Sequence, residues 1–309
     1  MPKDGSVLAG HRALITGGSS GIGVATARLL DERGVTVALL GRSPERLRAA
    51  ADSCNGYPVL VSGDVGDRGS LQQAVGSAAA QLGGDLDLLV VNAASTAFGP
   101  FDGMSERDFR RTFEVTFIGA VDTIRIALPL LQAGAGRIVV VSSIAGSVPI
   151  PLLSPYVAAK HALEGTVRAL QIELRARRSP ISISLVAPGP VATPFWRRMA
   201  LSGARRRPQP PLPYDAAVAA RAIVECLERP RRRLTVGGAT TAVKALAAVP
   251  PVYDRLAAIA ARRYMGPTPI DGRLGMLHDP NDATDDIGIG DHGRRSLMVR
   301  IRRRAATPR

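Results

Sequence analysis

The chain has 309 residues, and 46% of them are hydrophobic, which excludes a wholly disordered protein. The formal net charge is +14, but residues 1–192 carry 18 basic against 16 acidic side chains, whereas residues 193–309 carry 22 against 10. The two cysteines, with no Cys/His cluster at metal-ligand spacing, argue against a disulfide scaffold and predict no metal site.

The first predicted elements in chain order form a βαβ unit. Residues 13–16 are a short apolar run that predicts a buried parallel strand, and residues 17–23 are a glycine-rich turn. Apolar side chains at helical spacing follow, and residues 35–40 are the next apolar run. This order predicts a parallel sheet with helices on its faces. The turn favours a pyrophosphate, because helix N-terminal amides and the helix dipole attract an anion; the alternative is a tight turn without a ligand.

The glycine turn has the spacing TGxxxGxG, with Thr16, Gly17, Gly21 and Gly23 at the fixed positions. With this spacing the chain resembles the main single-domain branch of the short-chain dehydrogenase/reductase superfamily. The resemblance implies a doubly wound α/β fold, the Rossmann fold, with about seven parallel strands and helices on both faces. It also implies that a nicotinamide cofactor is held at the turn by Gly17, Ser19, Ser20, Gly21, Ile22 and Gly23.

The end of the second predicted strand carries Arg42 and no carboxylate. An acidic residue there would bond the ribose 2′-hydroxyl of NAD(H), whereas a guanidinium fork suits the 2′-phosphate of NADP(H). We therefore expect NADP(H) to be preferred over NAD(H). The alternative is that Arg42 is a solvated surface residue, since Ser19 and Ser20 bring no second basic side chain to the glycine turn.

Two further predicted strands, at residues 57–61 and 86–91, are followed by residues that the resemblance assigns to the cofactor. After the second strand the family pattern is Asn-Asn-Ala-Gly, and this chain departs from it at Val91 and Ala94. The resemblance implies that the adenine is contacted by Asp64 and Val65, and that the cofactor cleft is lined by Asn92 and Ala93.

A catalytic constellation follows the next predicted strand, an apolar β-branched run at residues 138–141 that ends before Ser143. Tyr156 lies thirteen residues after Ser143, and Lys160 lies four residues after Tyr156 on a predicted helix of residues 156–177. Positions i and i+4 share a helix face, so the phenol and the ammonium point the same way. Lys160 is one of three lysines in a chain with 37 arginines, which suggests that an ammonium is needed at this place.

This arrangement suits hydride transfer, in which the cofactor supplies the hydride chemistry and the protein handles the proton. We expect Tyr156 to be the acid/base, because the nearby ammonium of Lys160 would lower the pKa of the phenol from about 10. Ser143 is expected to orient and polarise the substrate oxygen. The resemblance implies the same three roles and adds that Lys160 binds the nicotinamide ribose.

Thr116 stands where the resembled family usually has an asparagine, in the helix before the catalytic strand. The family asparagine helps to hold a water that links the lysine to bulk solvent. Thr116 offers a hydroxyl and a main-chain carbonyl, so we expect a proton relay through it; the alternative is a threonine that only bonds within its own helix. This departure keeps a second function open, that of an NADP(H)-binding sensor or scaffold with little or no turnover.

The catalytic domain is predicted to span residues 1–240. A strand at residues 181–186 precedes the segment that the resemblance assigns to the nicotinamide, and residues 193–214 are the expected substrate lid, with five arginines. A helix at residues 215–228 and a last strand at residues 234–236 complete the domain. The residues implied for nicotinamide binding are Pro188, Gly189, Val191 and Thr193.

Beyond the domain, residues 241–265 predict two short helices broken by Pro250 and Pro251. They either pack on the body or at a subunit interface, or they contact a membrane surface or a lipid substrate, because a basic amphipathic helix can lie on anionic lipid. Residues 266–309 are predicted to be a flexible basic tail. Seven arginines lie at residues 294–309, but the scarcity of aromatic side chains argues against nucleic-acid binding.

Together these features predict an NADP(H)-dependent oxidoreductase that interconverts a carbonyl and a secondary alcohol on a small-molecule substrate, apolar or amphiphilic. Dehydration or epimerisation on the same scaffold is a less favoured alternative, because the Ser/Tyr/Lys set is intact. The resemblance implies a homodimer or homotetramer. A start without a signal segment, the lack of a run of roughly 18–20 apolar residues, and two thiols that suit a reducing compartment predict a cytoplasmic protein.

Overall fold

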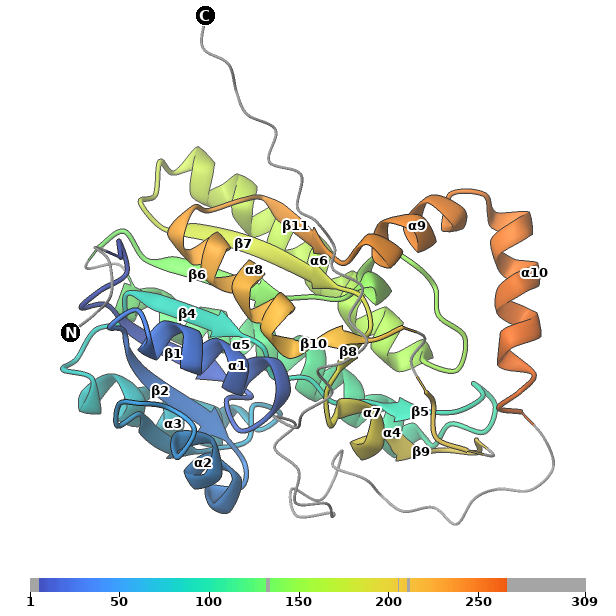
Figure 1. Cartoon of the computed structure of the whole chain (residues 1–309), viewed down its shortest axis with the longest axis horizontal. Helices are drawn as coiled ribbons and strands as arrows, with labels where there is room; N and C mark the ends of the chain where they lie inside the picture. Colours follow the sequence, from blue (N-terminus) through green and yellow to red (C-terminus); the bar gives the residue numbers. More distant parts are fainter. Residues whose placement is uncertain (1–5, 132–133, 205, 210–211, 266–309) are drawn as a thin grey trace, which may run out of the picture.

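A computed structural model describes residues 6–131, 134–204, 206–209 and 212–265, and it is built around one parallel sheet (Figure 1). Seven strands lie in the spatial order β11-β7-β6-β4-β1-β2-β3. The strands are β1 (Arg12–Thr16), β2 (Thr36–Gly41), β3 (Val59–Ser62), β4 (Leu88–Val91), β6 (Arg137–Val141), β7 (Ser182–Pro188) and β11 (Arg233–Val236). This sheet confirms the expected doubly wound fold, and each strand falls on an apolar run that predicted it.

Helices cover both faces of the sheet. One face packs against α1 (Gly21–Asp31), α2 (Pro44–Ala51) and α8 (Ala216–Glu228), and the other packs against α3 (Arg68–Gln81), α5 (Gly119–Leu131) and α6 (Ser154–Ala176). Because both faces are buried, the central strands are continuously apolar and do not alternate. Side-chain caps fix where several helices begin: Ser43 accepts from the Arg46 amide, Asp67 from the Ser70 amide and Asp215 from the Ala217 amide.

The topology places the ligand-binding edge. Strand β1 pairs with β2 on one side and with β4 on the other, so the strand order reverses between β1 and β4. Parallel sheets bind ligands at the carboxyl ends of their strands at such a reversal point. The glycine turn after β1, the asparagine after β4 and the serines after β6 therefore share one edge of the sheet.

Several short elements at this edge carry no periodic signal in the sequence. Two small parallel pairs join distant segments, β5 (Ala97–Phe98) with β9 (Ala200–Leu201) and β8 (Val191–Ala192) with β10 (Tyr214–Asp215). The remaining short elements are α4 (Glu106–Phe113), the π-helix η1 (Glu114–Ile118), the 3₁₀ turn η2 (Ile144–Gly146) and α7 (Phe195–Arg198).

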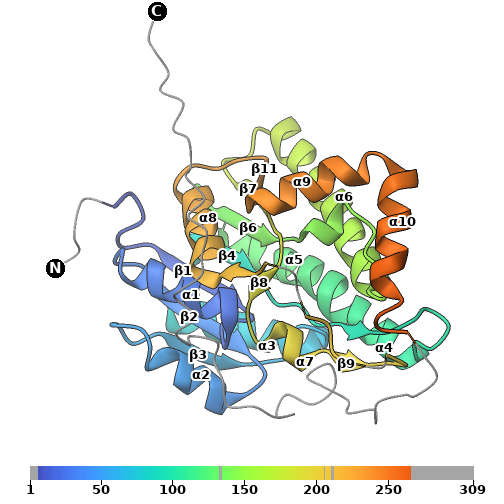
Figure 2. The same cartoon turned by 45° about the vertical axis from the view of Figure 1, so that its right-hand side comes forward.

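Two helices follow the last strand, as the sequence predicts. Gly237, with a positive φ of 93°, turns the chain from β11 into α9 (Gly238–Ala247). Pro250 and Pro251 occupy the first turn of α10 (Pro250–Ala261), where a missing amide costs no hydrogen bond. Figures 1 and 2 both place α10 on the opposite side of the molecule from α2.

Four apolar side chains along α10 are each about half exposed: Val249, just before the helix, and Val252, Leu256 and Ile259 within it. Over the described ranges, no helix is both long and apolar enough to cross a membrane. The predicted tail of residues 266–309 lies outside the described residues.

Candidate active site

A single cavity of about 830 Å³ runs along the carboxyl edge of the sheet. It brings together most of the residues that the sequence singles out. Thr16 and Gly23 of the glycine motif, and Thr116, do not reach its lining as the described residues define it. Those on the lining are Gly17, Ser19, Ser20, Gly21, Ile22, Arg42, Asp64, Val65, Asn92, Ala93, Ser143, Tyr156, Lys160, Pro188, Gly189, Val191 and Thr193.

The glycine turn is held against the end of β4 by Asn92. The Asn92 side-chain amide donates to the Thr16 carbonyl at 3.1 Å and to the Gly17 carbonyl at 3.2 Å. Gly17 has a positive φ of 66°, and a Cβ there would lie 2.9 Å from the Ala93 Cα. The turn therefore requires glycine both for its backbone angle and for its close approach to the neighbouring strand.

The N-terminus of α1 opens onto the cavity. Ser20 is the N-cap residue in extended conformation, and its side chain makes no capping hydrogen bond. The first amides of a helix lack intrahelical partners and carry the positive end of the dipole. The cradle of small residues and uncapped amides fits a pyrophosphate, which is the ligand that the turn predicts.

The loop after β7 closes the opposite side of the cavity. The Gly189 amide donates to the Tyr214 hydroxyl at 2.9 Å, and that hydroxyl donates to the Val236 carbonyl at 3.2 Å. A Cβ at Gly21 would lie 3.0 Å from the Thr193 methyl carbon, so this loop and the glycine turn nearly touch across the cavity.

Ser143, Tyr156 and Lys160 meet at the middle of the cavity. Ser143 follows β6, and its hydroxyl is hydrogen-bonded with Tyr156. Lys160 is buried, its ammonium donates to the Val141 carbonyl at 2.8 Å, and its Nζ lies 5.6 Å from the centre of the Tyr156 ring. Tyr156 and Lys160 stand one turn apart near the start of α6 and share one face of that helix, as the spacing predicts.

The expected direction of the Tyr156 pKa shift is wrong for this structure. Burial raises the pKa of Tyr156 to about 12, and the hydrogen bond with Ser143 offsets only part of that rise. Burial also lowers the pKa of Lys160 to about 8, while the carboxylate of Glu164 acts in the opposite direction. The Lys160 ammonium is directed to the Val141 carbonyl and not to the Tyr156 oxygen. Desolvation of the phenol therefore has a larger effect on the Tyr156 pKa than the positive charge of Lys160 has.

Glu164 is a buried carboxylate next to Lys160, and the sequence did not single it out. It lies one helical turn after Lys160, accepts from the Ser142 hydroxyl at 2.7 Å, and forms a salt bridge with Arg233 of β11. Arg233 in turn donates to the Ser147 hydroxyl at 2.7 Å. The i+4 spacing of an acid after the lysine was the available signal.

Thr116 lies in the π-helix η1 and is fully buried. Its hydroxyl donates to the Ser95 carbonyl at 2.7 Å and accepts from the Ser95 amide at 3.1 Å. The hydroxyl thus holds the loop after β4 at both main-chain groups of Ser95, and Ser95 itself lines the cavity. A proton relay at this position would have to use the main-chain carbonyl of Thr116.

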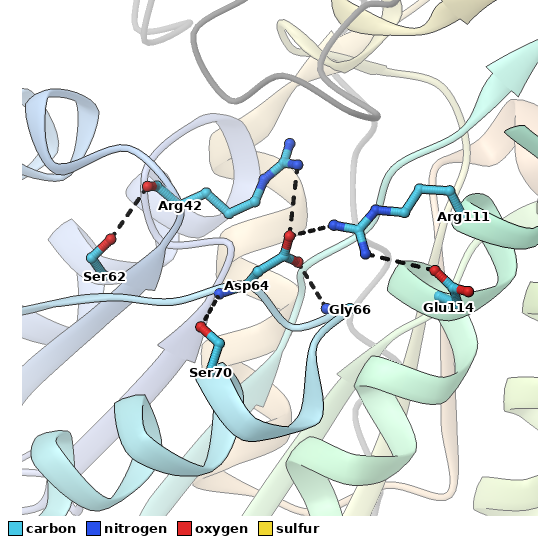
Figure 3. Close-up of polar contacts among 7 residues, drawn as sticks. All are labelled: Arg42, Ser62, Asp64, Gly66, Ser70, Arg111 and Glu114. Atoms are coloured by element: carbon cyan, nitrogen blue, oxygen red, sulfur yellow. Dashed lines mark hydrogen bonds and ion pairs between the residues drawn. The ribbon is translucent and has the colours of Figure 1, made fainter. Parts of the chain in front are cut away.

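A cluster of charges forms the far end of the cavity, beyond β2 and β3 (Figure 3). Arg42 approaches the Asp64 carboxylate at 4.0 Å, and Arg111 of α4 forms a salt bridge with the same oxygen. The other Asp64 oxygen accepts from the Gly66 amide at 2.8 Å, and Arg111 lies 3.7 Å from Glu114. Figure 3 shows the two guanidinium groups on either side of Asp64, which therefore orients Arg42.

Arg46 is a second basic residue at this end that the sequence analysis missed. It lines the cavity together with Arg42, from the first turn of α2. The sequence signal was its position four residues after Arg42 and three residues after Ser43, the serine that caps α2. Two guanidinium groups at the end of β2 provide more positive charge than Arg42 alone.

Comparisons with known proteins agree on one family. Residues 11–201 match the family model described as short chain dehydrogenase. The uncharacterized oxidoreductase YxnA of Bacillus subtilis is 31% identical over 251 residues, covering 79% of this chain and 70% of that protein. The hydroxysteroid 11-beta-dehydrogenase 1-like protein of Xenopus tropicalis is 34% identical over 195 residues, covering 62% of this chain and 68% of that protein.

Solved structures show the same likeness. An alcohol dehydrogenase of the archaeon Thermococcus sibiricus, complexed with 5-hydroxy-NADP, has a TM-score of 0.64 and 28% sequence identity. The likeness covers 73% of this chain and 95% of that structure.

Proposed function

Because this chain belongs to the short-chain dehydrogenase family, we propose that it is an NADP(H)-dependent oxidoreductase that interconverts a carbonyl and a secondary alcohol. The observation that carries the proposal is the meeting of Ser143, Tyr156 and Lys160 on one cavity with the glycine turn. The experiment that tests it is NADPH oxidation with a panel of ketones, followed by absorbance.

The cavity offers a holding group for each part of the cofactor. The glycine turn and the α1 amides would hold the pyrophosphate, Asp64 and Val65 the adenine, and Lys160 the nicotinamide ribose. Arg42 and Arg46 would hold the 2′-phosphate. A bound nicotinamide supplies or accepts the hydride.

The chain's own residues handle the oxygen and the proton. Ser143 holds the substrate oxygen beside the Tyr156 hydroxyl, and in reduction Tyr156 donates its proton to that oxygen as the carbonyl becomes an alcohol. The positive charge of Lys160 stabilises the phenolate that remains until it is protonated again. A phenol whose pKa burial raises to about 12 keeps its proton at neutral pH and can therefore donate that proton in reduction.

We expect the rate of carbonyl reduction to fall as pH rises through the pKa of Lys160, about 8. At neutral pH both Tyr156 and Lys160 carry the protons that reduction needs, and Lys160 is the first of the two to lose its proton. Glu164→Gln removes the negative charge that raises the Lys160 pKa and leaves Arg233 without its carboxylate. Both effects move the midpoint of the rate profile to lower pH.

The measurement is kcat for reduction as a function of pH in the wild type and the variant. Charged groups that face this site from other elements are Arg233 of β11 and Lys244 of α9, and both remain in the variant. Glu173→Gln is the control, because Glu173 is exposed on the same helix and pairs with Arg177 at 3.7 Å. A midpoint that moves to higher pH in Glu164→Gln, or that moves equally in the control, would contradict the assignment.

Arg42→Ala is expected to raise KM for NADPH by about 10- to 100-fold, the loss of one charge-assisted contact with a phosphate. KM for NADH should change little, because NADH lacks the 2′-phosphate. Arg48→Ala is the matched control, since Arg48 lies on α2, is exposed and does not line the cavity. If KM for NADPH and KM for NADH rose equally, Arg42 would support the fold at this end of the cavity and would not bind the 2′-phosphate.

The sensor or scaffold hypothesis has one observation in its favour, the commitment of the Thr116 hydroxyl to Ser95. If the relay is broken, the chain binds NADP(H) and turns over little. The same ketone panel separates the two functions, because a sensor binds NADPH without oxidising it. The oligomeric state and any membrane contact remain predictions from the sequence.

A further inference from the structure

The cavity continues past Tyr156 into a chamber with apolar walls. One wall comes from the body of the protein, where Phe98 of β5, Leu153, Phe195 and Trp196 line the cavity. The Phe195 ring lies 5.6 Å from the Tyr156 ring, centre to centre, so this wall begins directly beside the proposed acid. We call this space, between Tyr156 and α10, the chamber.

The opposite wall is made by α9 and α10, which lie beyond the residues that the family model matches. Leu246 of α9 and Leu256, Ala257, Ala260 and Ala261 of α10 line the cavity. The alanines form a shallow surface on α10, so the helix bounds the chamber without filling it.

Both ends of this wall are fixed to the body. Tyr253, near the start of α10, is buried, and its hydroxyl donates to the Pro149 carbonyl. Tyr264, just after α10, packs edge-on against Phe98 with ring centres 5.4 Å apart. Figure 2 shows α9 and α10 running from the end of β11 toward the side of the molecule where β9 lies. The contacts at Pro149 and Phe98 hold both ends of α10 against the body, so the helix forms a wall of the chamber.

Three polar groups on the lining are already engaged by the main chain. The Trp196 indole donates to the Val191 carbonyl at 2.8 Å, and the Tyr253 hydroxyl donates to Pro149. Thr240 of α9 donates to the Val236 carbonyl at 2.8 Å. These three groups are therefore already paired and offer little to the hydroxyls of a sugar, and the positive charge of Arg198 and Arg263 on the lining disfavours a cationic substrate.

We propose that the chamber binds the apolar body of the substrate, a ketone or secondary alcohol with an extended hydrocarbon skeleton. The substrate oxygen lies at Ser143 and Tyr156, and the hydrocarbon lies between Trp196 and the alanine surface of α10. This inference rests on the proposed oxidoreductase function for the position of the oxygen. The recognition of hydrocarbon rests on the walls alone.

The first test measures kcat/KM with NADPH for 2-alkanones of increasing length, from 2-butanone to 2-decanone. Each added methylene that enters the chamber should raise kcat/KM by roughly fourfold, the effect of burying one methylene group. Ala257→Phe fills part of the chamber. This substitution should lower kcat/KM for the long ketones more than it lowers kcat/KM for 2-butanone. Ala258→Phe is the control, because Ala258 is exposed on the same helix and does not line the cavity.

The second test does not depend on turnover. Trp196 is the single tryptophan of the chain and lines the chamber, so its fluorescence reports a ligand there. Titration of the Tyr156→Phe variant with 2-decanol should give a saturable change in emission, and L-fucose at the same concentrations should give none. The Ala257→Phe substitution should weaken the response to 2-decanol by tenfold or more, as is typical of overpacking.

The two tests separate this inference from the proposed function. In one outcome the protein turns over short ketones, kcat/KM does not rise along the series, and Trp196 gives no saturable response. This outcome would overturn hydrocarbon binding in the chamber and would leave the proposed oxidoreductase function standing. The opposite outcome is a saturable response to 2-decanol in a protein that does not oxidise NADPH with any ketone in the series. That outcome would overturn the proposed oxidoreductase function and would support the hydrocarbon site.

Discussion

The Tyr156→Phe substitution is expected to lower kcat for carbonyl reduction by about 10²- to 10⁴-fold, which is the usual contribution of a positioned general acid. The substitution removes the hydroxyl that bonds with Ser143 and leaves the ring that packs on Phe195 at 5.6 Å. NADPH should still bind, because the glycine turn and Arg42 are untouched. The measurements are NADPH oxidation with an accepted ketone and NADPH titration by fluorescence.

The matched control is Tyr214→Phe, which makes the same chemical change at another phenol whose pKa burial raises to about 12. The Tyr214 hydroxyl bonds the main chain at Gly189 and Val236, so its loss should lower the free energy of unfolding by about 1–3 kcal/mol. It should leave kcat far closer to the wild-type value than Tyr156→Phe does. Unchanged kcat in Tyr156→Phe would remove Tyr156 from the mechanism, and a wild type that oxidises no NADPH would favour the sensor.

Gly23→Ala is expected to be the most damaging single change in the nucleotide-binding turn. A Cβ at this position would lie 2.2 Å from the Gly17 carbonyl oxygen and 3.0 Å from the Asn92 amide nitrogen. The first of these atoms belongs to the main chain, so the turn itself must move. We expect a loss of about 1–3 kcal/mol in the free energy of unfolding, typical of overpacking, and at least a tenfold weaker affinity for NADPH.

Denaturant unfolding and NADPH titration check this prediction. Gly76→Ala is the control, because Gly76 is exposed in α3 and a Cβ there would meet nothing within 4 Å. That substitution should stabilise the protein by about 0.5–1 kcal/mol, since glycine is a poor residue for the interior of a helix. If Gly23→Ala bound NADPH as tightly as the wild type does, the close approach of α1 to the turn would not be needed for cofactor binding.

Much of the sheet could be predicted because its strands are short apolar runs separated by glycine and polar turns. Residues 138–141 illustrate this, since four β-branched or aliphatic side chains in a row suit a strand buried on both faces. The start of α8 was also readable, because Asp215 is a strong N-cap residue before an apolar face. Local signals of this kind depend on neighbours in the sequence and need no tertiary contact.

The features that escaped prediction depend on distant contacts. Strand β5 has two residues, and it pairs with β9 about a hundred positions later, so neither shows a period in the sequence. Arg111 lies among other charged residues on α4, so the sequence does not indicate its salt bridge with Asp64, which the fold creates. The Tyr156 pKa was predicted from its neighbour Lys160 alone, whereas the burial that raises it comes from the whole site.

The chain keeps its proposed chemistry and one of the two walls of the chamber in separate stretches. Ser143, Tyr156 and Lys160 fall within residues 11–201, whereas α9 and α10 follow the joint at Gly237. Mutations or exchanges after this joint alter the wall without entering the strands that align the catalytic groups. A chimera joined at Gly237 would therefore exchange the α9–α10 wall and leave the body wall, with Phe98 and Trp196, in place beside the proposed catalytic groups.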